Sequence, residues 1–433
     1  MKKKIFFFNG GSDYFLREFN LINFFFKIKR DFKCIFFFKE KIHLKIKNKK
    51  NFFTQNKLRL LLWSLVITCV NDLSIRKATP KYLHKILDEF SFHIKNKNYL
   101  FLLNIIRKLN AQRIIIYLAS VILKKTNEFN YKSDKEEIFV IYDGVLSLEV
   151  FDIISYANKF GNKSILILVN WDHAFKCHLM NPTLVLTWGK RSRQFLKDNF
   201  NLNCKEIGTP RFELAYKKTK LKNKNYAKKN YKILFAGNII PQDDISLLKI
   251  INNYINNKNY KIKIIYRPHP FGFSQINFDI FREEKDKFKM NNVFFDKNLH
   301  LYKRDSLESY VSLFLEIDGL ISSFSTLTLE AGIYKLPVLC YAINNPNDKY
   351  YNLFNFEIQC KYSPHLHLLN KYSWPIKAFG MREFFDKFDE LVSQIISSHS
   401  AKRNKIINNI IRREIYNDNL GYYERLKKQI ENI

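Results

Sequence analysis

Residues 319–341 read GLISSFSTLTLEAGIYKLPVLCY. The apolar segments at the two ends of this stretch are typical of buried strands, and the hydroxyl-rich turn between them predicts a helix that begins near Thr326. The start of such a helix combines unpaired backbone N–H groups, side-chain hydroxyls and the positive end of the helix dipole, which together favour an anion. The stretch therefore predicts a strand, an anion-binding turn, a helix and a second strand in succession.

A second polar motif lies upstream, where the sequence IIYRPHP at residues 264–270 puts Arg267 and His269 just after another apolar run. The two prolines hold the chain extended, so the arginine and the histidine are expected to project on the same side. Both side chains can donate hydrogen bonds to a phosphate. Because ligands of open α/β sheets bind beyond the carboxyl ends of the strands, this motif and the serine-rich turn are expected to meet at one ligand.

The length and composition predict a globular protein with two domains of about 200 residues each, since the chain has 433 residues of which 46% are hydrophobic. Its 73 Lys+Arg against 40 Asp+Glu give a formal net charge of +33. Abundant Lys, Asn, Ile, Phe and Tyr with few Gly and Pro is also the composition that an AT-rich genome produces. The basic residues are spread along the whole chain and no RNA- or DNA-binding module is recognisable, so we do not expect nucleic acid as a partner.

The cysteines and the apolar runs indicate the cellular compartment in which the protein is expected. The six cysteines are scattered and include no CxxC pair, which argues against a zinc site or a disulfide framework and fits a reducing cytosol. The basic N-terminus is followed by an apolar run too short for a signal peptide. The longest apolar stretch elsewhere, Leu58–Val70, is interrupted by Arg59 and is too short to span a bilayer. We therefore expect a cytoplasmic protein with no transmembrane segment.

Residues 1–215 are expected to form an N-terminal α/β domain. Strand candidates at residues 3–8 and 34–38 flank a helix candidate at 14–28, and a helical block covers residues 54 to 128. Continuous apolar runs separated by helix-length segments, typical of a buried parallel sheet, follow at residues 138–142, 165–169 and 184–188.

The lysine-rich residues 216–230 have the composition of a solvated linker. Residues 231–382 then repeat the α/β pattern, with a strand before Gly237, the strand that ends at Arg267, a strand near Val293 and the serine-rich unit. Residues 383–433 have the pattern of charged helices. We expect at least one of these helices to cross back onto the first domain.

The candidates for binding an anionic donor follow the predicted strands of the second domain. They are Arg267, His269, Ser322, Ser323, Ser325, Thr326, Glu330, Gly237 and Asn238, with Arg211 just before the linker. Glu330 lies four residues after Thr326 on the same helix face, where its carboxylate can accept hydrogen bonds from a ribose diol. The plainer interpretations are that the serines form a helix cap, which contributes about 1 kcal/mol, and that the helix dipole favours the glutamate.

Two carboxylates of the first domain are candidates for a general base. Asp143 follows one predicted strand directly, and Asp172 follows Trp171 at the end of the next, so both are expected at the same edge of the sheet. A base needs hydrogen-bond reach to the proton it removes, and we favour Asp143. The candidates for binding an acceptor are Gly10 and Gly11, which follow the first strand, together with Trp171 and Asp172.

Three motifs together resemble those of the GT-B glycosyltransferases, particularly bacterial surface-polysaccharide enzymes and their relatives among sialyltransferases, polysialyltransferases and CDP-glycerol polymerases. They are YDG at residues 142–144, RPHP at 267–270 and SSFST at 322–326 with Glu330, in the order and spacing of those enzymes. Tyr142 stands where the sialyltransferase-like motif usually has a second acid. The similarity is therefore to GT-B enzymes broadly, and it covers mainly residues 138–345.

The resemblance implies an α/β fold of two Rossmann-like domains facing a cleft, with a helical insertion in the first. It implies that Asp143 is the base, that His269 binds the donor phosphate and that Ser322 and Ser323 grip it. Ser325, Thr326 and Glu330 resemble the phosphate turn and ribose-binding glutamate of hexosyltransferases that use UDP or GDP donors. Residues 1–135 give no family signal, and the helical block there is a candidate for acceptor recognition.

We therefore expect a glycosyltransferase that moves a sugar from a nucleotide-activated donor to a cell-surface glycan or a lipid-linked acceptor. The transfer is expected to be metal-independent and inverting and to need no cofactor, with Arg267, His269 and the helix start near Thr326 neutralising the departing phosphate. Aromatic and lysine-rich surfaces could hold the protein peripherally at the inner face of the plasma membrane. The alternatives are a CDP-polyol phosphotransferase, which shares the RPHP and serine motifs, and a non-catalytic binder of glycan or nucleic acid.

Overall fold

The computed structural model describes residues 2–10, 27–38, 56–71, 73, 97–134, 136–144, 147–176, 179–219, 230–237, 244–268, 278–296, 307–323, 325–341, 364–366, 372–397, 400–418 and 420–433. The chain divides into two compact units. The first unit consists of Met1–Pro210 together with Glu414–Ile433, and the second unit consists of Arg211–Arg413. The predicted helix at 14–28 and the linker at 216–230 lie largely outside the described residues.

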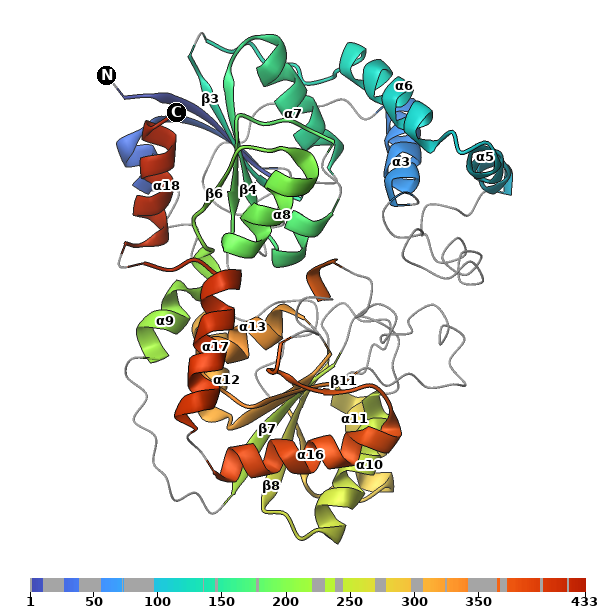
Figure 1. Cartoon of the computed structure of the whole chain (residues 1–433), viewed down its shortest axis with the longest axis vertical. Helices are drawn as coiled ribbons and strands as arrows, with labels where there is room; N and C mark the ends of the chain where they lie inside the picture. The colour runs from blue at the N-terminus through green and yellow to red at the C-terminus, as the bar shows by residue number, and fades with distance from the viewer. Residues whose placement is uncertain are drawn as a thin grey trace. The chain divides into compact units, whose positions relative to one another are not determined.

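The first unit is built on a parallel sheet of six strands (Figure 1). The strands are β1 (Lys4–Asn9), β2 (Lys33–Phe38), β3 (Ile138–Asp143), β4 (Lys163–Leu168), β5 (Leu184–Thr187) and β6 (Cys204–Glu206). Their order across the sheet is β2-β1-β3-β4-β5-β6. This is the flavodoxin-like order, extended by one strand, and the order reverses between β1 and β3.

The second unit has its own parallel sheet of six strands. They are β7 (Tyr231–Ala236), β8 (Ile262–Arg267), β9 (Val293–Phe295), β10 (Gly319–Ser322), β11 (Val338–Tyr341) and β12 (Ile376–Ala378), in the order β12-β11-β10-β7-β8-β9. Counted within the unit, this is the Rossmann order, and it reverses between β7 and β10. Two parallel sheets with flanking helices confirm the predicted α/β fold of two Rossmann-like domains.

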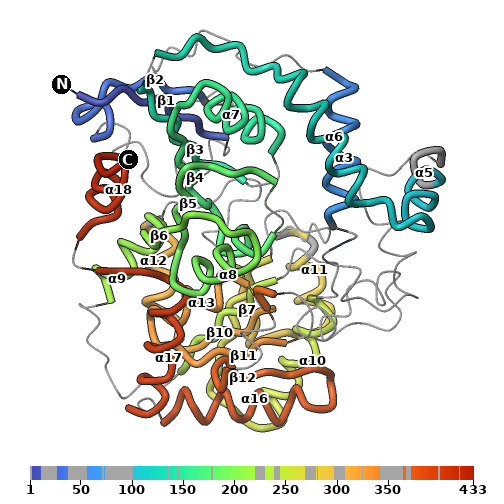
Figure 2. Tube along the Cα trace, turned by 45° about the horizontal axis from the view of Figure 1, so that its top comes forward, coloured from blue at the N-terminus to red at the C-terminus, as the bar shows by residue number. Residues whose placement is uncertain are grey.

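Helices lie between the strands of both sheets and after the last strand. In the first unit they are α3 (Lys57–Asn71), α5 (Lys97–Lys108), α6 (Gln112–Lys125), α7 (Leu148–Lys159), the 3-10 helix η3 (Trp171–Phe175), α8 (Lys190–Phe200) and α18 (Tyr422–Glu431). Those assigned to the second unit or entering it are η4 (Pro210–Phe212), α9 (Glu213–Thr219), α10 (Asp244–Asn257), α11 (Phe278–Lys287), α12 (Leu307–Glu316), α13 (Thr326–Ile333), α16 (Met381–Ile396) and α17 (Ala401–Glu414). Helices α3, α5 and α6 fall within residues 54–128, and Figure 2 shows α3 beside α6.

Both faces of the first sheet are covered. Alternate residues of its strands, such as Ile5 and Val140, pack in one buried cluster with Tyr422, Leu426 and Ile430 of α18. The opposite face packs against α7. This alternation follows from the two-residue period of a strand, and continuous apolar runs are what a sheet covered on both faces requires.

The segment that returns to the first unit passes close to Gly208. This glycine has a φ of +74°, and a Cβ built on it would lie 2.2 Å from the carbonyl oxygen of Tyr416. Both the backbone conformation and the space therefore require glycine at this position.

The second sheet has its main core on one face, where α10, α11 and α16 pack on Phe235, Tyr266 and Tyr341. Helix α13 packs against β10 and β11 on the other face of the sheet, and it also packs closely against α17 and Trp374. A Cβ on Gly332 would lie 2.5 Å from Ile411 of α17 and 2.7 Å from Trp374. No helix of the described residues is long and apolar enough to cross a membrane.

Candidate functional site

The strand order of the second sheet sets the place where a ligand is expected. The order reverses between neighbouring β7 and β10, and ligands of open α/β sheets bind beyond the carboxyl ends of strands at such a point. In register, Ala236 at the end of β7 pairs with Arg267 on β8 and with Ser322 on β10. The Gly237 N–H donates to the Arg267 carbonyl at 2.9 Å. The structure therefore brings Gly237, Arg267 and Ser322, three predicted donor-binding residues, to one edge of one sheet.

Arg267 is held by groups on two further elements. Its Nη1 donates to Asp296 Oδ2 at 2.5 Å, and its guanidinium carbon lies 4.7 Å from the centre of the Tyr310 ring. Asp296 follows β9 directly, and Tyr310 is on α12. Arg267 is 6% exposed, so the ion pair is buried, and the guanidinium plane is fixed by the carboxylate and the ring.

A second buried ion pair lies against the same tyrosine. Arg211 Nη2 donates to Glu330 Oε2 at 3.2 Å, and the Arg211 guanidinium lies 5.9 Å from the Tyr310 ring centre. Glu330 is 1% exposed. Sequence reasoning assigned these two residues separate contacts with a donor, whereas the structure pairs them with each other.

The serine-rich turn forms a capped helix start. Ser325 is the N-cap of α13, and its hydroxyl oxygen accepts a hydrogen bond from the Leu327 N–H at 3.3 Å. The helix begins at Thr326, as the sequence predicts. Ser322 and Ser323 are buried at the end of β10. The turn thus has the cap of the plainer interpretation and also lies at the edge where an anion is expected.

Buried side chains of α13 and β11 follow the turn in the sequence. Thr328 and Cys340 lie 3.4 Å apart through Oγ1 and Sγ, and burial raises the pKa of the Cys340 thiol to about 12. Burial, together with the Glu330 carboxylate, also raises the pKa of Tyr334. These groups are therefore neutral near pH 7 and are not reactive groups.

The first sheet has its own switch point, between β1 and β3. Gly10 follows β1, and its N–H donates to the Tyr142 carbonyl at 3.3 Å. A Cβ on Gly10 would lie 1.9 Å from Asp143 Oδ2, so the carboxylate occupies the space that a side chain would fill. A Cβ built on Gly144 would lie 3.3 Å from the imidazole Cε1 of His173, which is a tight but much less severe contact. Gly10, Asp143 and His173 are therefore close neighbours at the carboxyl edge of this sheet.

The other acceptor-side candidates have different surroundings. Trp171 is 2% exposed, and its indole N–H donates to Glu414 Oε2 at 2.9 Å, beside the buried pair of Arg191 and Glu414. This tryptophan therefore contributes to packing of the first unit. Asp172 is half-buried and pairs with Lys176 at 2.7 Å. Of the two candidate bases, Asp143 is the one that lies at the switch point, beside Gly10.

Three predicted site residues, Gly11, Asn238 and His269, lie outside the described residues. Sequence reasoning missed Asp296 and Tyr310. Asp296 carried a usable signal, because it is an acid directly after a predicted strand, as Asp143 is. Tyr310 lies inside an ordinary amphipathic helix and gave none. Among the described residues, no three His, Cys, Asp or Glu side chains form a group that could hold a metal ion.

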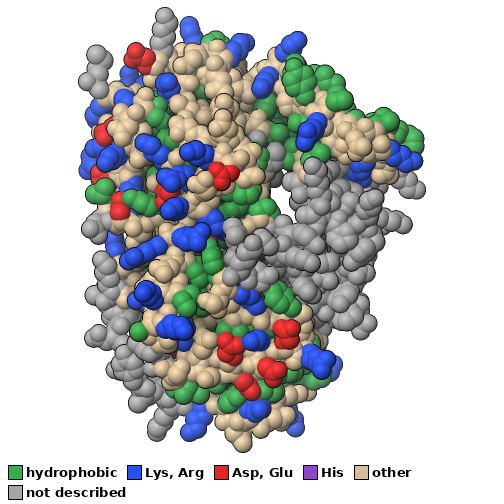
Figure 3. All heavy atoms as spheres, viewed as in Figure 1, with side chains coloured by type: hydrophobic (Ala, Val, Ile, Leu, Met, Phe, Trp, Pro, Cys, Tyr) green, Lys and Arg blue, Asp and Glu red, His purple; other side chains and the backbone are tan. Residues whose placement is uncertain are grey.

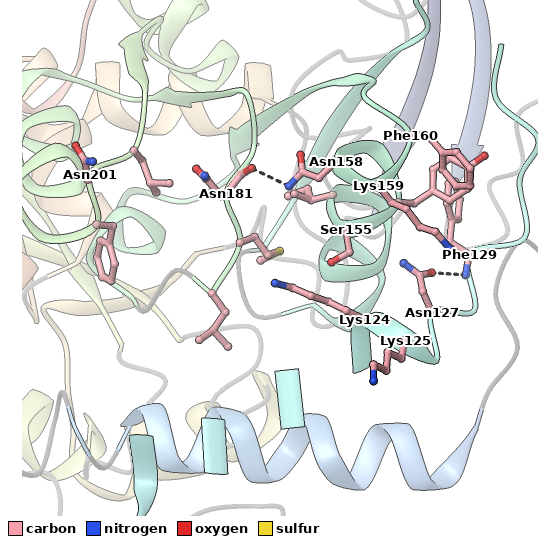
Figure 4. Close-up of a pocket in the computed structure, with 16 residues that line it drawn as sticks. Lys124, Lys125, Asn127, Phe129, Ser155, Asn158, Lys159, Phe160, Asn181 and Asn201 are labelled. Carbon is pink, nitrogen blue, oxygen red and sulfur yellow. Dashed lines mark hydrogen bonds between the residues drawn. The ribbon is translucent and has the colours of Figure 1, made fainter. Parts of the chain in front are cut away.

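A cavity of about 1090 Å³ lies elsewhere in the first unit (Figure 4). Lys124, Lys125, Lys159 and Asn181 are among its lining residues. Lys159 ends α7 just before β4, and Asn181 precedes β5, so the cavity lies at the amino ends of these strands. It is therefore distinct from the switch-point edge, which is formed by the carboxyl ends.

No protein-family model and no curated protein matches the chain. Solved structures similar to it include S. aureus MnaA in a co-structure with UDP, at 10% identity and a TM-score of 0.45 over 99% of this chain and 96% of that one. A glycosyltransferase from Rickettsia africae ESF-5 is 11% identical with a TM-score of 0.47, over 100% and 97% of the two chains. The wall teichoic acid polymerase TagF is 12% identical with a TM-score of 0.41, over 73% and 85%. Likenesses this weak assign no activity, and the fold of this chain is defined by its own two parallel sheets.

Proposed function

We propose that the chain is a glycosyltransferase that takes a sugar from a nucleotide-activated donor and transfers it to a glycan or lipid-linked acceptor. The observation that carries this proposal is that Gly237, Arg267 and Ser322 follow or end three adjacent strands at the carboxyl edge of the second sheet, two of which flank its switch point. A Rossmann-type order with a cationic side chain, hydroxyls and a helix start at that point suits the phosphates of a nucleotide.

In this proposal the two buried ion pairs orient the donor site. A guanidinium has five N–H donors in a planar fork, so an arginine that already binds one carboxylate can still donate to a phosphate. Asp296 and Glu330 fix the planes of Arg267 and Arg211, and the sequence motif adds His269 two residues after Arg267. The departing phosphate would be stabilised by these donors and by the start of α13.

The first unit would supply the base. Asp143 would accept the proton of the acceptor hydroxyl as the oxygen attacks the anomeric carbon, with inversion there and without a metal ion. The close contact with Gly10 restricts the rotamers of this carboxylate, and such restriction supports a positioned base.

The test is thermal stabilisation of the purified protein by CMP, CDP, UDP and GDP. A ligand at 100 times its dissociation constant adds about 2.7 kcal/mol of stability and raises the melting temperature. We expect a selective rise that Arg267→Lys and His269→Ala abolish. The matched control Arg282→Lys, at an exposed arginine of α11, leaves the rise unchanged.

Selectivity among the nucleotides names the donor class. CMP would indicate a sialic-type sugar, UDP or GDP a hexose, and CDP a polyol phosphate transferase in place of a glycosyltransferase. No rise with any nucleotide would refute the proposal.

A further inference from the structure

Large apolar side chains are exposed on three neighbouring helices of the first unit. Among the described residues, 11 of the 17 exposed large hydrophobic side chains belong to α3, to α6, or to α5 and the turn after it. Figure 3 shows such side chains gathered over α5 and α6 at the upper right. The residues that define this surface, the helical face, are Leu58, Phe101, Leu109, Ile114, Tyr117 and Leu118, each between 51% and 71% exposed.

The same helices also have a buried apolar side, so the helical face is not needed for the core. Trp63 of α3 packs on Phe151 of α7, with ring centres 5.2 Å apart. Arg59 Nη2 binds Asp152 Oδ1 of α7 at 2.5 Å, and Leu123 of α6 is fully buried. A surface helix normally has one apolar stripe, and a helix that is apolar on both sides requires a second apolar environment.

The charged residues on α3, α5 and α6 themselves all have one sign. Residues 56–71 and 97–127 contain no Asp or Glu. Lys57, Lys108 and Arg113 are exposed there. On α6 the exposed Ile114, Leu118 and Ile122 follow one another at helical spacing and form one stripe. Lys125 lies at the end of this stripe and is one of the residues that line the cavity (Figure 4).

We propose that the helical face binds an anionic membrane surface. Its aliphatic and aromatic side chains would insert among the lipid acyl chains, and the surrounding Lys and Arg side chains would contact the lipid phosphates. An amphipathic face with bases at its border is the pattern of helices that lie in the bilayer interface. A second copy of this chain fits less well, because it would bring two acid-free basic faces together. The proposal goes beyond the donor chemistry, since it concerns residues remote in sequence from the donor motifs.

The experiment is sedimentation of the full chain with vesicles of phosphatidylcholine, with and without phosphatidylglycerol, and without any nucleotide. We expect binding to the anionic vesicles. Ile114→Ser, Tyr117→Ser and Leu118→Ser together should weaken it by about tenfold or more, because binding scales with buried apolar area. The matched control Ile250→Ser, Ile396→Ser and Leu420→Ser removes exposed apolar side chains elsewhere and should leave it unchanged.

A second variant tests the charge. Lys108→Gln, Arg113→Gln and Lys125→Gln should weaken binding to anionic vesicles by roughly fivefold per residue, which corresponds to about 1 kcal/mol per basic side chain near an anionic leaflet. Failure of the wild type to bind anionic vesicles would overturn the proposal. An equal loss of vesicle binding in the control triple variant would also overturn it. So would sedimentation velocity that shows the wild type as a dimer and the helical-face variant as a monomer. A failure here leaves the nucleotide test unaffected, so the two proposals are separable.

Discussion

The two sheets have the same kind of switch point but bring different chemistry to it. In the first sheet a glycine approaches a carboxylate, Gly10 against Asp143. In the second sheet Arg267 and Ser322 lie on either side of Ala236, one strand away in each direction, and Arg267 is held by Asp296. The backbone topology determines where a ligand can sit, and the side chains after each strand determine which ligand and which chemistry. In the function that we propose, this difference becomes a division of labour in which one unit removes a proton and the other binds phosphate.

The largest effect should come from removing the first unit's carboxylate. Asp143→Asn should lower kcat by about 10²- to 10⁴-fold, the usual contribution of a general base, with little change in donor binding. The measurement is a transfer assay with the donor that the nucleotide screen selects. Asp172→Asn is the control, because this half-buried acid pairs with Lys176. Loss of activity in the control alone would move the base to Asp172 and break the comparison.

The second unit should be sensitive to removal of a buried charge. Glu330→Gln leaves Arg211 without its carboxylate and should cost about 3–5 kcal/mol, read from hydrogen exchange of the α9 and α13 peptides. Arg282→Met, which removes an arginine that is 61% exposed, should cost no more than about 1 kcal/mol. The double variant Arg211→Met with Glu330→Leu should recover part of the loss, and no recovery would contradict pairing as the cause.

A smaller effect should follow from crowding the first switch point. Gly10→Ala puts a Cβ within 1.9 Å of Asp143 Oδ2, so the carboxylate must move, at about 1–3 kcal/mol. We expect lower stability in urea unfolding and reduced kcat. Gly380→Ala is the control, since a Cβ there meets no atom within 4 Å. Full activity of Gly10→Ala would show that the contact does not position the base.

The smallest effect is a pH dependence confined to the first unit. Hydrogen bonds from Arg30, Tyr423 and Lys427 hold the pKa of Asp31 well below its usual value. A lowered pKa in the folded state contributes stability that is present above the unfolded value near 4 and is lost as the pH falls below it. The stability difference between wild type and Asp31→Asn should therefore shrink below pH 4. A difference that stays constant from pH 6 to acid would contradict the linkage.

The strands of both sheets could be predicted because fully buried parallel strands require continuous apolar runs, as in Phe139–Tyr142 and Ile165–Leu168. The start of α13 was also predictable, since the N-cap residue Ser325 acts through a contact only two residues away. Local rules of this kind therefore predicted most of the elements that form the carboxyl edge of the second sheet.

What could not be predicted depends on contacts between distant residues. Trp171 bonds to Glu414, 243 positions later, so its burial has no local pattern. Arg211 and Glu330 are 119 positions apart, and their pairing changes the interpretation of both. The side chain of Tyr310 lies near both arginines, and α12 packs on α9, so this arrangement depends on tertiary contacts.

The first unit contains both the beginning of the chain and its last described helix, because α18 completes the core over β1 and β3. Proteins are synthesised from the N-terminus, and domains generally fold as units during that process. On the ribosome this order is reversed here: the continuous segment Arg211–Arg413 can fold as soon as it emerges, whereas the unit that starts the chain stays unfinished until Tyr422–Glu431 has been made. A chain that stops before Tyr422 would therefore lack part of the core of the first unit.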